Sequence, residues 1–322
     1  LPLGDTTEDP LFPLDAEHGW ANGALRELLR AMYEPALAAA PASDATVARA
    51  YWMLGGDLAP IRQPAAAEPT RHFDQAGVHV LADEALDARL VFRAGPMADQ
   101  ALSAGHAHAD VLSLHLNVGG RPVVVNSGTG TYRAAGRRWP VGCPDWRHYF
   151  AGPRSHNAVF VGVDPFGPMT GDFRNRDVPC RVRLRRRSFG PGIGFLEFEV
   201  VATNAADGLR RCVVHAEGVG WLVEDGWRAG PDGAASFGLQ FAPGADVAIP
   251  TDGKVVASLE GVACRIDLEP AWLEPAVLSG SLNPLGGWVA LRYGDWVAAP
   301  QMRAVAAAGR AAVRFSADER VD

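Results

Sequence analysis

The chain has 322 residues, of which 48% are hydrophobic and 21% are charged, a composition typical of a folded globular protein with a large core. Its formal net charge of −7 argues against general nucleic-acid binding. No run of about 18 apolar residues occurs, so the sequence predicts no membrane span. The four cysteines are far apart and form no CxxC pair, which argues against a zinc ribbon or a disulfide-dense scaffold.

Two helices are predicted near the start of the chain, between residues 20 and 55. The segment GALRELLRAMYEPALAAA repeats leucine and methionine at helical spacing, and Ser43 in SDATVARAYWMLGG is a candidate helix cap. Residues 55–70 are rich in proline and alanine, which is typical of a linker between domains. Because the chain begins at Leu1 without a signal-like apolar stretch, we interpret it as a piece of a longer protein.

After about residue 72 the pattern changes to short strands separated by glycine, proline, asparagine and aspartate turns. More than a dozen strand-like runs with no helical period between them predict an antiparallel β-sandwich. In CRVRLRR, the arginines at 181, 183 and 185 alternate with apolar residues. This alternation predicts a strand with one wet face and places these arginines at the surface.

The stretch AGHAHADVLSLHL, residues 104–116, raises the main functional question. As a strand it would place His106, His108 and Asp110 on the same face as its leucines, where each polar group needs a partner. Three interpretations are open: a hydrogen-bonded polar cluster, a metal site that uses His108 and His156, or a catalytic His106 that faces a substrate cleft. The last two interpretations are compatible with each other.

Histidines and arginines are concentrated in the same part of the sequence. From Thr131 to Phe160 there are five arginines and a single aspartate. A local basic patch on an acidic chain favours a specific anionic ligand, and a solvated arginine loop is the alternative. Five of the nine histidines lie in or next to this region: His106, His108, His115, His148 and His156.

The segments GHAHADVLSLHLNVGGRPVVVNSGTGTY and WRHYFAGPRSHNAVFVGVD resemble the signature of the heparinase II/III-like family of polysaccharide lyases. That signature consists of an HxHAD strand, an Asp-Ser/Pro-Gly-Thr-Tyr turn and a WRxxF…HN segment that leads into a strand. The resemblance is strongest over residues 104–164. It implies that residues 1–66 are the last helices of an α/α toroid plus a linker, with the rest of the toroid missing from this chain. Residues 67–322 would form a large antiparallel β-sandwich.

The resemblance also implies β-elimination at a uronic acid of an acidic polysaccharide. In that reaction the carboxylate is neutralised, a base removes the C5 proton and an acid protonates the leaving 4-oxygen. A periplasmic or secreted location is implied by the family alone, and no organic cofactor is expected. By position in the motifs, the candidate catalytic residues are His106 and Tyr132, the candidate substrate-binding residues are Arg133, Arg147 and Arg154, and the candidate ligands of a structural zinc ion are His108, Asn126 and His156.

The chain departs from the family pattern at three positions. Asn126 replaces the usual aspartate of the turn, and a neutral amide oxygen is a poorer metal ligand than a carboxylate. Gly130 stands where the turn usually has its first tyrosine, and Ala151 stands where an arginine commonly follows WRxxF. The catalytic residues that such a lyase draws from its toroid are not in this chain, so we expect the isolated fragment to be inactive.

Two functions therefore compete. The first is a lyase acting on a uronic-acid polymer such as a glycosaminoglycan, alginate or a bacterial exopolysaccharide. The second is a non-catalytic carbohydrate-binding or cell-envelope assembly protein with the same fold, which the changes at Asn126 and Gly130 would favour. A metal-dependent oxidase or isomerase built on HxH is less favoured, because no further histidine and glutamate follow Asp110 at the spacing of a small barrel.

Overall fold

The computed structural model describes residues 70–95, 107–132, 143–162, 169–170, 174–175, 180–202, 208–228, 234–250, 254–307 and 309–318. The helices and linker expected in residues 1–66 lie outside the described residues, as do His106 and Arg133. Within the described ranges, no helix is long and apolar enough to cross a membrane.

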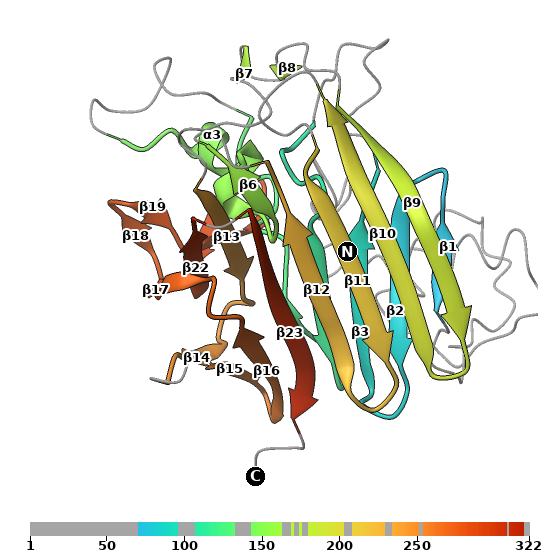
Figure 1. Cartoon of the computed structure of the whole chain (residues 1–322). Helices are drawn as coiled ribbons and strands as arrows, with labels where there is room; N and C mark the ends of the chain where they lie inside the picture. The colour runs from blue at the N-terminus through green and yellow to red at the C-terminus, as the bar shows by residue number, and fades with distance from the viewer. Residues whose placement is uncertain are drawn as a thin grey trace, which may run out of the picture. The chain divides into compact units, whose positions relative to one another are not determined.

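Three antiparallel sheets make up most of the described chain (Figure 1). The five-stranded sheet has the order β1 (Arg71–Phe73), β2 (Val78–Asp83), β3 (Ala88–Arg93), β4 (Leu114–Val118), β5 (Arg121–Val124). The eight-stranded sheet has the order β14 (Asp246–Ala248), β15 (Lys254–Leu259), β16 (Val262–Leu268), β23 (Arg310–Asp318), β12 (Gly220–Gly226), β11 (Arg210–Ala216), β10 (Ile193–Ala202), β9 (Cys180–Gly190). The four-stranded sheet has the order β17 (Leu273–Leu278), β22 (Gln301–Ala306), β13 (Ala235–Gln240), β6 (Val159–Val161).

Smaller elements complete the described fold. Three two-stranded ribbons pair β7 (Met169–Thr170) with β8 (Arg174–Asn175), β18 (Ser281–Leu282) with β19 (Leu285–Gly286), and β20 (Trp288–Arg292) with β21 (Asp295–Ala298). A short helix α3 (Trp146–Ala151) and a 3₁₀ turn η2 (Pro153–Ser155) precede β6. Every strand pair among the described residues is antiparallel, which confirms the predicted mainly β, antiparallel fold class.

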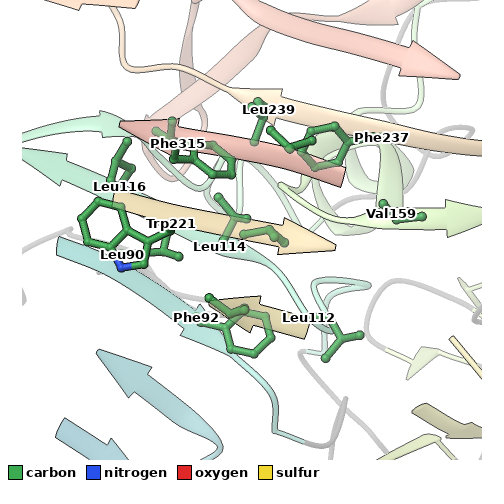
Figure 2. Close-up of a cluster of buried hydrophobic side chains, with 14 of the residues drawn as sticks. Leu90, Phe92, Leu112, Leu114, Leu116, Val159, Trp221, Phe237, Leu239 and Phe315 are labelled. Carbon is green, nitrogen blue, oxygen red and sulfur yellow. The ribbon is translucent and has the colours of Figure 1, made fainter. Parts of the chain in front are cut away.

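The core lies between the inner faces of these sheets, as Figure 2 shows. The rings of Phe92 of β3 and Phe198 of β10 pack at a tilt with their centroids 5.1 Å apart, so the five-stranded and eight-stranded sheets are in direct contact. Trp221 and Phe315 lie in the same core and are almost fully buried. Each large apolar side chain buried in this way stabilises the fold by about 1.5–3 kcal/mol. The alternation of buried and exposed residues along β10 and β12 follows the two-residue period of the sequence.

The predicted strand over residues 104–116 is wrong in its first part. Within the described residues of this stretch, β4 begins only at Leu114. Leu112 has a positive φ of 60°, and the Ser113 N–H donates a hydrogen bond of 3.0 Å to the carbonyl of Asp110. A left-handed residue interrupts the alternation of side chains on which the strand prediction depended. His108 and Asp110 therefore lie on a turn that leads into the strand.

The pKa of a buried histidine in β2 makes the fold sensitive to acid. His79 is 2% exposed, and burial, assisted by the neighbouring His72, lowers its pKa from 6.5 to about 4. Below pH 6.5 the unfolded chain binds a proton at His79, whereas the folded chain does not until the pH approaches 4. The contribution of His79 to the free energy of unfolding is therefore fully present above pH 6.5 and is lost as the pH falls toward 4. At pH 5 we expect His79 alone to lower the free energy of unfolding by about 2 kcal/mol.

A His79→Phe variant tests this expectation, because phenylalanine suits the contacts that His79 makes with Phe92 and Phe198. Urea unfolding of both proteins at pH 7 and pH 5 should show a smaller acid loss for the variant. Other buried histidines also contribute, so the comparison concerns the difference between the two proteins. Equal acid losses would contradict the assignment to His79.

Candidate functional site

Three segments that are separate in sequence converge beside the core: residues 107–113, the turn 125–132 and the α3–η2 region. The Ala109 N–H donates to the carbonyl of Ala151 at 2.8 Å, and the Leu114 N–H donates to the carbonyl of Asn157 at 3.1 Å. The Asn157 side chain joins β4 to the residue that follows β5, because its amide nitrogen donates to the carbonyls of Leu114 and Val125 at 2.8 and 2.7 Å. Its amide oxygen accepts from the Gln240 N–H at 2.6 Å. Asn157 therefore fixes the position of the neighbouring His156.

His108, Arg147 and His156 form a buried group that we call the histidine–arginine cluster. The Nη1 atom of Arg147 lies 3.3 Å from Nε2 of His108, and the rings of His108 and His156 are 5.4 Å apart. All three residues are at most 1% exposed. The guanidinium of Arg147 also lies 5.4 Å from the ring centre of Tyr132, a cation–π distance. The cluster thus brings together three residues that the motifs predicted, and Tyr132, a fourth predicted residue, lies next to them.

Neutral imidazoles surround the one buried carboxylate of this region. Asp110 is buried and pairs with Arg93 at 3.2 Å. Burial lowers the pKa of His156 to about 3, although the Asp110 carboxylate acts in the opposite direction. Burial likewise lowers the pKa of His115 to about 4. Around neutral pH, His115 and His156 are therefore uncharged, while Arg93 and Arg147 bring positive charge next to Asp110 and His108.

The short helix α3 explains why Arg147 points inward. Asp145 caps the helix by accepting a hydrogen bond of 3.0 Å from the N–H of His148. Trp146, Tyr149 and Phe150 follow the i, i+3, i+4 pattern and pack against aromatic residues of β20 and β21. This aromatic anchor fixes the helix, so that Arg147 is held against His108.

The turn before Tyr132 is shaped by two glycines and an asparagine. The Asn126 side-chain oxygen accepts a hydrogen bond of 2.9 Å from the Gly128 N–H. Gly130 has a φ of 64°, and a Cβ atom at this position would overlap the Phe150 ring. A tyrosine at position 130 is incompatible with this packing, which accounts for the departure noted in the sequence. Tyr132 is half-buried, with its ring 5.4 Å from that of Tyr293.

The implied zinc site can be tested on these contacts. His156 fits a metal ligand, since neither of its ring nitrogens makes a hydrogen bond to a described residue. The other donors fit poorly. Asn126 supplies a neutral oxygen that is already hydrogen-bonded, and the Arg147 guanidinium lies beside the Nε2 atom of His108. A divalent cation there would be repelled by the buried guanidinium and would have no anionic ligand in the predicted set. The described residues contain no group of three or more His, Cys, Asp or Glu side chains suited to a metal.

We therefore expect zinc removal to leave the thermal stability of the protein unchanged. An Asn126→Asp variant supplies the missing negative charge, and we expect zinc to raise its melting temperature by about 5 °C. Thermal unfolding with zinc and with a chelator measures both effects. Adding His156→Ala to the variant is the control, because it should abolish the response. A wild-type protein that retains one zinc per chain after dialysis would contradict this expectation.

Arg154, a further predicted residue, is not part of the histidine–arginine cluster. Arg154 is exposed on η2, where its carbonyl accepts a hydrogen bond of 2.8 Å from the Gln301 side chain. Arg147, in contrast, is fully buried, so its position suits the support of His108 and Tyr132 better than direct contact with a ligand. His106 and Arg133 lie outside the described residues. The roles of Asn157 and Arg93 had not been predicted, although the HN pair of the motif includes Asn157.

An antiparallel sandwich of this kind also occurs in solved lyases. A mutant of heparan sulfate lyase HepC from Pedobacter heparinus has a TM-score of 0.63 and 16% identity, covering 99% of this chain and 44% of its own. A heparinase III gene product has a TM-score of 0.64 and 14% identity, covering 99% and 43%. A further heparinase III has a TM-score of 0.59 and 17% identity, covering 86% and 42%. At these identities the similarity shows the fold, and the chain spans less than half the length of these structures.

The sequence itself shows the family. Residues 65–311 match the family described as "Heparinase II/III-like, C-terminal". The chain therefore belongs to the heparinase II/III-like family, whose members are polysaccharide lyases, as the motifs predicted. No curated protein matched the sequence.

Proposed function

We propose that this chain is the C-terminal part of a polysaccharide lyase that cleaves a uronic-acid-containing polymer by β-elimination. The observation that carries the proposal is the family match over residues 65–311. That range includes the two motif segments that meet at the histidine–arginine cluster. A periplasmic or secreted location belongs to the same proposal.

The residues of the chain suit distinct parts of this chemistry. His106 is the proposed group that reaches into the cleft for proton transfer, with Tyr132 as its proposed partner. The exposed guanidinium of Arg154 and that of Arg133 would neutralise the uronate carboxylate, which makes the C5 proton easier to remove. The buried Arg147 would hold His108 and the Tyr132 ring in position. No step is assigned to a metal.

A non-catalytic, carbohydrate-binding protein of the same fold is the second candidate. Two observations favour it: Asn126 supplies no charge, and Gly130 is required by the packing of Phe150. Both positions lie in the turn that carries Tyr132. A protein that had lost elimination would keep the sandwich and its surface charges, since neither depends on turnover.

The formation of a 4,5-unsaturated uronate distinguishes the two candidates, because this product absorbs in the ultraviolet. The complete gene product is incubated with a panel of uronic-acid polymers, sulfated and unsulfated, while the absorbance is followed. A rise with any polymer supports the lyase and identifies the substrate class. A flat trace from protein shown to be folded by circular dichroism would overturn the lyase proposal in favour of binding.

A further inference from the structure

Strand β9 carries a concentration of positive charge that the proposed chemistry does not use. The strand has eleven residues, Cys180–Gly190. Five of them are arginines and none is acidic, in a chain whose net charge is −7. The strand lies at one edge of the eight-stranded sheet, as Figure 1 shows. Its arginines, all of them exposed, are Arg181, Arg183, Arg185, Arg186 and Arg187.

The register with β10 gives the face on which these side chains lie. Arg183 is opposite Glu199, and Arg186 is opposite Glu197. The residues that alternate with these two glutamates, among them Phe198, are buried in the core, so the glutamates and their partners face outward. A register shift next to Phe198 lets the chain present one more arginine on the outer side. We call the set Arg181, Arg183, Arg185 and Arg186 the β9 arginine face.

Acidic neighbours neutralise only part of this charge. Arg185 pairs with Glu199 and Arg186 with Glu197, each at 3.4 Å. Glu199 is shared with Arg210 of β11 at 3.2 Å. Neither of the other two members of the β9 arginine face, Arg181 and Arg183, forms an ion pair with a described residue. The outer face therefore keeps a surplus of guanidinium groups that are accessible to an anion.

Protection of the sheet edge does not account for this composition. Charged side chains on an edge strand discourage pairing with another chain, and cations serve that purpose, but edge protection requires no surplus of one sign on the outer face. Three of the five arginines are already ion-paired, Arg187 with Asp74 at 2.9 Å, and the repulsion among the others is relieved when an anion binds. The surplus of positive charge thus points to an anionic partner.

A hollow next to the β9 arginine face adds polar groups for a larger ligand. It has a volume of about 400 Å³ on the outer side of the same sheet, and Glu197 and Glu199 connect it to β9. Arg210, Arg228 and Arg310 also line it, together with a third carboxylate, Glu224. The hollow thus carries guanidinium groups as well as carboxylates, and the carboxylates can accept hydrogen bonds from sugar hydroxyls. No residue of the histidine–arginine cluster lines this hollow.

We propose that the β9 arginine face and the adjoining hollow bind a stretch of acidic polysaccharide, as a second contact site on the outer surface of the sandwich. The identity of the polymer rests on the proposed function, whereas the preference for an extended polyanion rests on the charges of β9. Bound there, a long chain is held close to the enzyme between cleavage events, while a short oligosaccharide gains nothing from this site.

The test compares two double variants of the complete gene product. Arg181→Ser/Arg183→Ser removes the two β9 arginines that form no ion pair with a described residue. Arg71→Ser/Arg121→Ser removes two exposed arginines from the five-stranded sheet and is the control for net charge. Equilibrium binding to heparin and to polygalacturonate is measured at two salt concentrations. We expect the dissociation constant of the β9 variant to rise about tenfold, with a weaker salt dependence, and that of the control to change less than about twofold.

Equal affinities of the two double variants would overturn the proposal. Turnover is measured separately, so that this result is distinguishable from failure of the proposed function. If the protein is a lyase, the β9 variant should raise the KM for the polymer about tenfold and leave the kinetics on a short oligosaccharide unchanged. If no polymer is cleaved but the tenfold loss of binding remains, the second contact site stands and the elimination chemistry does not.

Discussion

Replacing Arg211 with methionine should lower the free energy of unfolding by about 3–5 kcal/mol, because it leaves a buried carboxylate without its partner. Arg211 of β11 is fully buried and forms a bidentate ion pair with Asp225 of β12, with distances of 2.7 and 2.8 Å. Its remaining Nη1 group donates to the carbonyl of Leu112, the residue with positive φ. Urea unfolding at pH 7 measures the loss.

The neighbouring arginine provides a matched control. Arg210 forms an exposed ion pair with Glu199, so Arg210→Met should cost less than about 1 kcal/mol. The double variant Arg211→Met/Asp225→Leu should recover most of the lost stability, because no charge is then buried unpaired. If Arg211→Met unfolded at the same urea concentration as Arg210→Met, the pair would have no structural importance.

The same contact explains why part of the fold could not be predicted. The alternation of side chains was sufficient for β10, whose burial follows the two-residue period, and it also located β9, although that strand is exposed along almost its whole length. It failed over residues 107–113 because the backbone there is held by Arg211, which is 99 residues away from Leu112 in the sequence. A tertiary contact of this kind leaves no local signal. Helix α3 was missed for a different reason, since six residues are too short to show a helical period.

The sequence predicted which residues belong to the candidate site, but not how their side chains contact one another. The motifs predicted His108, Arg147 and His156 as site residues, and the structure places them in one cluster. The sequence did not indicate that Arg147 is buried against His108, because the aromatic anchor of α3 uses residues of β20 and β21 far along the chain. The role of Asn157 was not predictable for the same reason, because its side chain bonds to backbone groups of Leu114, Val125 and Gln240, which are distant in the sequence.

His106→Ala in the complete gene product should reduce the rate of elimination by about 100-fold or more without lowering the melting temperature. The reason is that a positioned imidazole contributes to proton transfer by this factor, while an alanine removes the proton carrier and leaves the fold intact. The rate is followed as ultraviolet absorbance of the unsaturated product, with the polymer that gives the largest signal for the wild type. Thermal unfolding of the same samples separates a loss of catalysis from a loss of structure.

His148 supplies the control for this experiment, because it is a histidine of the same region with its side chain 48% exposed and bonded to Asp145. His148→Ala should keep the wild-type rate within about twofold, since its ring is exposed, pairs with Asp145 and has no part in the proposed chemistry. If His106→Ala were as active as His148→Ala, proton transfer would have to be assigned elsewhere, with Tyr132 as the next candidate. A large loss for His106→Ala alone would instead support His106 as the proton-transfer residue, two positions before the His108 that Arg147 holds in place.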